Sequence, residues 1–184
     1  DRSHPGTLID AEPNGESSEV KAVTYVKDVT IITVEGSGVH AGPGVARRVY
    51  QSTEDAGANV LMSSQAVSQN SISLAVTKTE ASKAVKQLKK VFAAEILKDP
   101  KTKKAKVSIR VEPEHAIIAV VGEGMRGHAG VALQLFSALK SKNVSARMIA
   151  QGANELNISV AICEKDLRAA LQVVHDALVS PKSH

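Results

Sequence analysis

The sequence contains no tryptophan, and aromatic residues make up only 2% of its 184 positions. Proteins that hold single strands of nucleic acid stack bases on aromatic side chains, so this composition argues against that function. A single cysteine, Cys163, excludes an intramolecular disulfide and makes the reducing cytoplasm the expected compartment. No apolar run approaches the roughly 18 residues of a membrane-spanning helix, and no signal peptide is visible. We therefore expect a soluble, cytoplasmic protein that binds neither nucleic acid nor membranes.

Residue patterns typical of enzymes are also missing. His40 and His128 lie in glycine-rich segments, but no cysteine, aspartate or second histidine stands at the spacing of a metal site. The glycines from Gly36 to Gly44 have neither the dinucleotide-binding spacing nor the Gly-Lys-Ser/Thr ending of a phosphate-binding loop. No nucleophile stands with a base that would activate it. We expect no catalytic residue, no metal ion and no cofactor.

What the sequence does contain is a duplication. Residues 31–76 and 117–162 align without a gap at an offset of 86 positions. Glycines, apolar core positions and one glutamine recur, as in the pairs Gly36/Gly122, Ile32/Ile118 and Gln65/Gln151. Chance rarely preserves all three classes of residue, so the sequence predicts two copies of one supersecondary unit.

Each copy predicts the order β-α-β-β-α. The runs Val29–Val34 and Ile117–Val121 predict buried strands, because they are short, rich in β-branched residues and closed by glycine. A glycine loop and a helix follow in each copy, and the helices end at Gly57 and near Asn143. The remaining strands are predicted at 59–66, 70–77, 145–151 and 156–163, and the second helices at 80–97 and 165–179.

One further strand completes the ferredoxin-like βαββαβ sandwich, an α+β fold in which a four-stranded antiparallel sheet carries two helices on one face. The first copy finds this strand at Lys106–Val111. The second copy has no sequence left for it after its last helix, so we expect Val20–Val26 to complete its sheet. The first unit is then nested within the second. The predicted domains are 27–112 for the first and 20–26 plus 113–180 for the second, with 1–19 as a linker.

The repeated loop and glutamine predict a ligand. The start of a helix presents free N–H groups and a positive dipole, which suit a carboxylate, while strand carbonyls and Asn59 suit an ammonium group. Gln65 and Gln151 end the second strands, where their amides can meet a ligand hydroxyl or, alternatively, the adjacent backbone. The pattern favours a free amino acid.

Three longer motifs carry a family resemblance: Gly57-Ala-Asn-Val-Leu-Met-Ser-Ser-Gln65, Val120-Val-Gly-Glu-Gly-Met-Arg-Gly127 and Met148-Ile-Ala-Gln-Gly-Ala-Asn-Glu-Leu-Asn-Ile-Ser159. They resemble the tandem ACT domains of aspartate kinase. The leader His4–Ile9 resembles the segment that closes the catalytic domain in that family, and the Lys-Phe-Gly-Gly start of the kinase domain is not in the sequence. The resemblance implies a regulatory portion without enzymatic activity, made as a small subunit or excised from a longer chain.

The resemblance also implies feedback control of the aspartate-family pathway by an end-product amino acid. Threonine is favoured and lysine comes next, because the two glutamines resemble threonine-responsive members. The implied partners are a second copy, paired through the ACT domains, and an aspartate kinase catalytic domain or subunit. The first effector site would comprise Ala41, Gly42, Pro43, Gly44, Val45, Ala46, Asn59, Val60, Leu61 and Gln65. The second would comprise Met125, Arg126, Val131, Ala132, Ser145, Ala146 and Gln151.

Two departures from the family pattern indicate that one site is weak or purely structural. Ala66–Gln69 replaces the common Ser-Ser-Glu, and Ala129 replaces a common proline. One alternative is the regulatory half of a bifunctional aspartate kinase–homoserine dehydrogenase, because the lysine-rich connection 98–106 is similar to that in those enzymes. The other is a stand-alone amino-acid sensor or dimerisation module.

Overall fold

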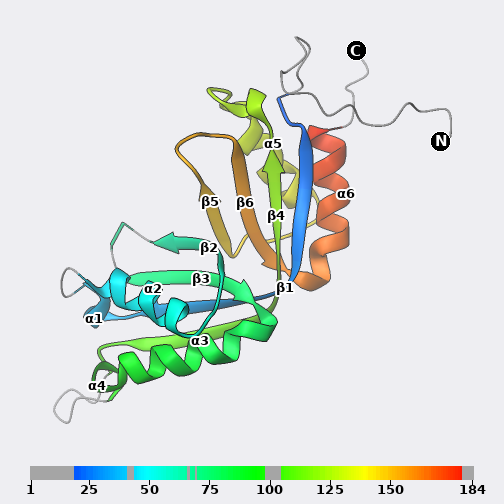
Figure 1. Cartoon of the computed structure of the whole chain (residues 1–184). Coiled ribbons are helices and arrows are strands. Elements are labelled where there is room, and N and C mark those ends of the chain that lie inside the picture. Colours follow the sequence, from blue (N-terminus) through cyan, green and yellow to red (C-terminus); the bar gives the residue numbers. More distant parts are fainter. Residues whose placement is uncertain (1–18, 41–43, 66, 69, 98–104, 180–184) are drawn as a thin grey trace, which may run out of the picture.

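The computed structural model describes residues 19–40, 44–65, 67–68, 70–97 and 105–179. It is an α+β fold in which six antiparallel strands form one sheet, in the order β2-β3-β1-β4-β6-β5 (Figure 1). The strands are β1 (Ala22–Glu35), β2 (Val60–Gln65), β3 (Ser71–Thr77), β4 (Ser108–Val121), β5 (Met148–Gln151) and β6 (Asn157–Cys163). The helices are α1 (Ser37–His40), α2 (Val45–Asp55), α3 (Lys78–Val91), α4 (Ala93–Ile96), α5 (Gly130–Ser141) and α6 (Leu167–Leu178), with 3-10 turns η1 (Glu123–Met125) and η2 (Glu164–Asp166). The predicted fold class is confirmed.

The two central strands are longer than the sequence predicts. β1 and β4 have 14 residues each and pair with one another from Ala22↔Val121 to Glu35↔Ser108. The second half of β1 also pairs with β3, and the second half of β4 pairs with β6. The strands expected separately at 20–26 and 29–34 are therefore one strand, as are those expected at 106–111 and 117–121. The two halves of the molecule share both strands.

A local irregularity lets each central strand pass from one half of the sheet to the other. Asp28 in β1 and Glu114 in β4 have positive φ values of 57° and 62°, and the pairing register shifts between Val26 and Ile31. Such an irregularity bends and twists a strand without ending its ladder. Asp28 and Glu114 stand at equivalent positions of the two repeats, 86 residues apart. Each central strand therefore passes from one half of the sheet to the other at the same point of its repeat.

Glycine is required where each central strand ends. Gly36 follows β1 and lies against the carbonyl group of Lys106, and Gly122 follows β4 and lies against the backbone of Glu19 and Val20. A Cβ atom at either glycine would overlap that backbone. The segment that precedes β4 passes close to Gly36, and the segment that precedes β1 passes close to Gly122. Both repeats therefore need a glycine at this position.

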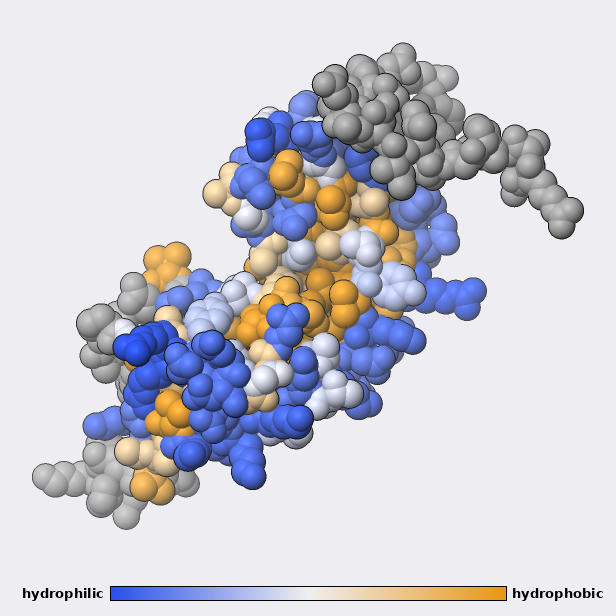
Figure 2. Space-filling model, in the orientation of Figure 1, coloured by the Kyte–Doolittle hydropathy of each residue, from blue (hydrophilic) through white to orange (hydrophobic). Residues whose placement is uncertain are grey.

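Three apolar clusters stabilise the sheet. One lies beneath α2 and α3 and includes Ile32, Leu74 and Phe92, and the second lies beneath α5 and α6 and includes Ile118 and Leu135. The third, which we call the junction cluster, comprises Val29, Ile31, Met62, Ala75, Ile117, Met148 and Ala161. It lies on the sheet face opposite the helices, and Figure 2 shows apolar surface in the hollow between the two halves.

Two predicted helices have different boundaries in the structure. The helix predicted at 80–97 breaks at the buried Phe92 into α3 and α4, and the one predicted at 165–179 begins with η2. At the break, Arg48 Nη2 donates to the carbonyl of Val91 at 2.7 Å, which satisfies an acceptor at the end of α3.

Most of the predicted linker, 1–18, lies outside the described residues, as does 98–104 of the lysine-rich stretch. None of the helices that the structure describes is both long and apolar enough to cross a membrane.

Candidate functional site

A pocket of about 240 Å³ lies at the start of α5. Its lining residues are Met125, Gly127, His128, Ala129, Val131, Ala132, Gln151, Glu155 and Ile158. Four of them, Met125, Val131, Ala132 and Gln151, are among the seven residues predicted for the second effector site. Pockets for drug-sized molecules have volumes of roughly 300–1,000 Å³, so this one suits a smaller metabolite.

One wall of the pocket is built by the glycine loop after β4. η1 buries Met125 in the cluster beneath α5 and α6, and Gly127 then turns the chain with a φ of 73°. The N–H of His128 donates to the carbonyl of Met125 at 3.1 Å, which closes this turn. Ala129 stands at the N-cap of α5, and no side chain among the described residues caps the helix. The first turn of α5 therefore presents backbone donors that no side chain satisfies.

The opposite wall is formed by the end of β5 and the turn that follows it. Gln151 is the last residue of β5, and the N–H of Glu155 donates to the carbonyl of Gly152 at 2.9 Å. Glu155 Oε2 accepts a hydrogen bond of 2.6 Å from the N–H of Gly127. This bond connects the turn after β5 to the glycine loop across the pocket.

Three predicted residues of the second site do not line the pocket. Arg126 donates from Nε to the carbonyl of Asn154 at 3.4 Å, Ser145 is exposed, and Ala146 packs against the cluster beneath α5 and α6. Conversely, five lining residues were not predicted from the sequence, namely Gly127, His128, Ala129, Glu155 and Ile158. These five residues could have been predicted from the family motifs, because they stand within or directly after the motifs 120–127 and 148–159.

The residues predicted for the first site are only partly brought together. Ala41, Gly42 and Pro43 lie outside the described residues, and Gly44 is the N-cap of α2 with a φ of 104°. Val45, Ala46 and Val60 pack against the cluster beneath α2 and α3, whereas Leu61 packs against the junction cluster on the other face. The pairing register of β2 is irregular between Val60 and Met62, so Leu61 turns to the face of Met62 and away from Val60. Asn59 and Gln65 are exposed near the two ends of β2.

The strands that carry the two glutamines are in contact. Leu61 and Met62 of β2 share the junction cluster with Met148 and Ala150 of β5. β2 and β5 are also the two outer strands of the sheet. The candidate sites are therefore linked through one apolar cluster.

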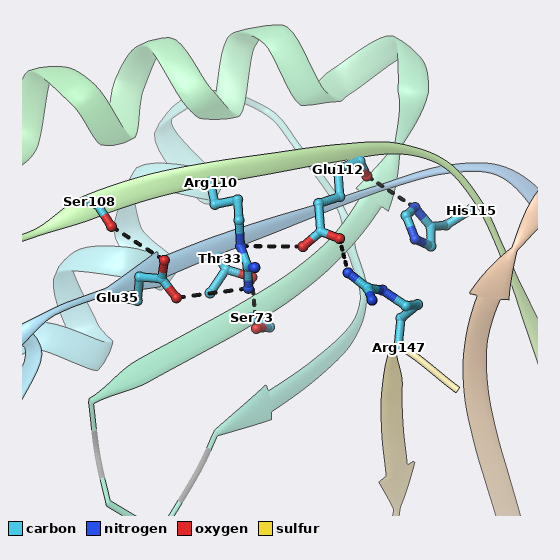
Figure 3. Close-up of polar contacts among 8 residues, drawn as sticks. All are labelled: Thr33, Glu35, Ser73, Ser108, Arg110, Glu112, His115 and Arg147. Carbon is cyan, nitrogen blue, oxygen red and sulfur yellow. Dashed lines mark hydrogen bonds and ion pairs between the residues drawn. The ribbon is translucent and has the colours of Figure 1, made fainter. Parts of the chain in front are cut away.

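An ion-pair network also crosses the junction (Figure 3). Arg147, directly before β5, donates to Glu112 of β4, and Arg110 Nε lies 3.3 Å from the same carboxylate. The hydrogen bond from Arg147 is the main cause that lowers the pKa of Glu112 below its usual value. His115 lies close by, with Nδ1 3.2 Å from the carbonyl oxygen of Glu112. No group of three or more metal-ligating side chains occurs within the described ranges.

The comparisons with known proteins agree with this architecture. A family model of the ACT domain matches twice, at residues 32–92 and 118–178. The chain is 36% identical over 180 residues to the chloroplastic bifunctional aspartokinase/homoserine dehydrogenase of Daucus carota, covering 94% of this chain and 19% of that protein. It is 34% identical over 182 residues to an aspartate kinase of Pseudomonas fluorescens, covering 94% of this chain and 40% of that enzyme.

Among solved structures, the regulatory subunit of aspartate kinase from Thermus thermophilus, in its ligand-free form, superposes with a TM-score of 0.73. It is 28% identical, and the match covers 86% of this chain and 98% of that subunit. The chain thus spans less than half the length of the two sequence relatives but nearly all of a regulatory subunit. It belongs to the ACT domain family, as the tandem ACT regulatory region of an aspartate kinase or of a bifunctional aspartokinase/homoserine dehydrogenase.

Proposed function

We propose that this region binds a free amino acid in the pocket at the start of α5 and thereby controls an aspartate kinase by feedback. The observation that carries the proposal is that two kinds of polar group face each other across a pocket of about 240 Å³. One wall offers N–H donors of an uncapped helix start, and the other offers the amide of Gln151 and the carboxylate of Glu155. An amino acid brings a carboxylate and an ammonium group to such a pair of walls.

Threonine is the proposed effector and lysine the second candidate. A bound lysine carries two ammonium groups, and each would need an acceptor, preferably a charged one. Glu155 is the single carboxylate among the lining residues. Threonine needs only one such partner, and its hydroxyl suits the amide of Gln151.

We further propose that two copies pair through the outer strands. β2 and β5 each have one edge without a neighbouring strand in the described part of the chain. An open strand edge is a template for pairing with a second copy. Ile149 of β5 is 49% exposed, so such pairing would also bury apolar surface.

Control of the kinase follows if the effector binds one arrangement of the dimer more tightly than another. Such coupling usually amounts to roughly 1–3 kcal/mol. We propose that the kinase domain or subunit responds to this arrangement of the dimer.

We also propose that the first ACT domain comprises residues 27–112 and the second comprises residues 20–26 plus 113–180, with residues 1–19 as a linker. The proposed compartment is the cytoplasm.

Calorimetric titration of the dialysed protein with threonine, lysine, methionine and isoleucine tests the proposed binding. We expect saturable heat with threonine and a loss of affinity of about tenfold in Q151A, because a hydrogen bond is worth roughly 0.5–1.5 kcal/mol. Q172A, which removes an exposed glutamine of α6 outside the pocket, is the matched control. An absence of heat with all four amino acids, at concentrations where the dimer is verified, would refute the proposed function.

A further inference from the structure

We propose that Glu155 binds the α-ammonium group of the effector and so makes the pocket bind amino acids more tightly than the corresponding hydroxy acids. This inference rests on the proposed function, since it concerns the same pocket. Glu155 is not among the residues predicted for either effector site from the sequence.

Glu155 sets the charge of the pocket lining. Glu155 contributes a carboxylate, whereas the other polar side chains that line the pocket are those of His128 and Gln151. Hydrogen bonds between an ammonium group and a carboxylate are roughly twice as strong as those between neutral groups. Among the lining side chains, Glu155 is therefore the partner that distinguishes an ammonium group from a hydroxyl group.

The carboxylate of Glu155 is held in place and can still accept further hydrogen bonds. The N–H of Gly127 donates to Oε2 at 2.6 Å, and Oε1 has no partner among the described residues. A carboxylate offers about four lone-pair positions. Glu155 can thus accept a hydrogen bond from the ligand without releasing Gly127, so the pocket wall need not rearrange on binding.

The backbone of Glu155 has an unusual conformation. Glu155 has a φ of 57°, a left-handed conformation in which glycine and asparagine are favoured over other residues. The same turn contains Gly152 and Asn154, yet the left-handed position itself carries a glutamate. The hydrogen bond from Gly127 gives the glutamate a structural role in this turn, and the same bond fixes its carboxylate at the pocket wall.

The two repeats carry different residues at the position of Glu155. Gln69 stands at the position of the first copy that corresponds to Glu155, at the offset of 86. A neutral amide there would not discriminate an ammonium group in the same way. The expected stoichiometry is therefore one tightly bound amino acid per chain, in the second half.

E155Q is the informative variant, because its amide oxygen can still accept from Gly127 while the negative charge is gone. E123Q, in the same loop but outside the pocket lining, is the matched control. Each protein is titrated with L-threonine and with 2,3-dihydroxybutanoate, in which a hydroxyl replaces the α-ammonium group. If the wild type binds lysine in place of threonine, the same pair is made from lysine and its α-hydroxy analogue.

We expect E155Q to bind the amino acid roughly tenfold or more weakly, because a hydrogen bond to a charged group is stronger than one between neutral groups even at this partly buried site. Binding of the hydroxy acid should stay within about threefold, and E123Q should match the wild type with both ligands. Unchanged binding of the amino acid to E155Q would overturn the role of Glu155 alone, and so would an equal loss for both ligands. If the wild type binds no amino acid, the proposed function fails and the inference fails with it.

Discussion

Arg147 donates a hydrogen bond to Glu112 across the junction between the two halves of the sheet (Figure 3). Glu112 belongs to the half of β4 that pairs with the β3-paired half of β1, whereas Arg147 leads into β5. The backbone N–H of Arg147 also donates to the carbonyl of Ala161 in β6 at 2.7 Å. Arg147 therefore connects β6, through its backbone, to the part of β4 that lies in the other half of the sheet, through its side chain.

E112Q should lower the free energy of unfolding by roughly 0.5–1 kcal/mol at pH 7, since the pair is only partly shielded from solvent. The folded protein has the lower pKa for Glu112, so this stabilisation is present above the unfolded pKa of about 4.3. It is lost as the pH falls through the folded value. Urea denaturation at pH 7 and pH 3 should show the difference between wild type and variant shrinking in acid. E114Q, two residues further on and without an ion pair in the described chain, should show no such difference at either pH.

R48A should lower the free energy of unfolding by about 1–2 kcal/mol, because one side chain makes three contacts. The guanidinium of Arg48 lies 4.2 Å from the centroid of the Phe92 ring, pairs with Glu95 at 2.7 Å and satisfies the carbonyl of Val91. Arg48 also lowers the pKa of Glu95 through this hydrogen bond. Chemical denaturation of R48A and of R47A, the neighbouring exposed arginine, measures the effect. Equal stability of the two variants would contradict the role assigned to Arg48.

G122A should lower the free energy of unfolding by about 2 kcal/mol or more, because the new methyl group must displace the backbone of Glu19 and Val20. G130A is the control, since its Cβ would meet only the flexible end of Gln134 at 3.6 Å. Thermal unfolding of the two variants should differ by several degrees. A G122A protein as stable as G130A would show that the entry into β1 can move freely.

I149K tests the proposed pairing of two chains through β5. Charge on an exposed edge strand opposes pairing with another chain, so the variant should dissociate at concentrations where the wild type is dimeric. Light scattering behind size-exclusion chromatography measures the mass of each species. L133K changes an equally apolar residue, 70% exposed on α5, and should leave the mass unchanged. A dimeric I149K would place the interface elsewhere.

Much of the secondary structure could be predicted because its signals are local. β-branched runs closed by Gly36 and Gly122 predicted buried strands, and the predicted strands at 59–66 and 70–77 agree with β2 and β3 within a residue or two. The break at Phe92 was not predictable in this way. At the break Phe92 is buried, and Arg48, which is distant in sequence, meets the carbonyl of Val91 only in the folded chain.

The candidate site shows the same division. Met125, Val131, Ala132 and Gln151 were named because the repeat and the family motifs mark them, and they meet in one pocket. Glu155 was missed because its relation to Gly127 is a contact between residues 28 positions apart. Whether the pocket binds threonine stays a prediction.

The sequence by itself determined the duplication and the alternation of strands and helices, because glycine placement and apolar periodicity act over a few residues, and its longer motifs carried the resemblance to the ACT family. Only the tertiary structure decided that β1 and β4 each run continuously through both halves. A strand continues as long as partner strands satisfy its backbone, and those partners come from distant parts of the chain. For the same reason, the fold alone brought the carboxylate of Glu155 to the start of α5.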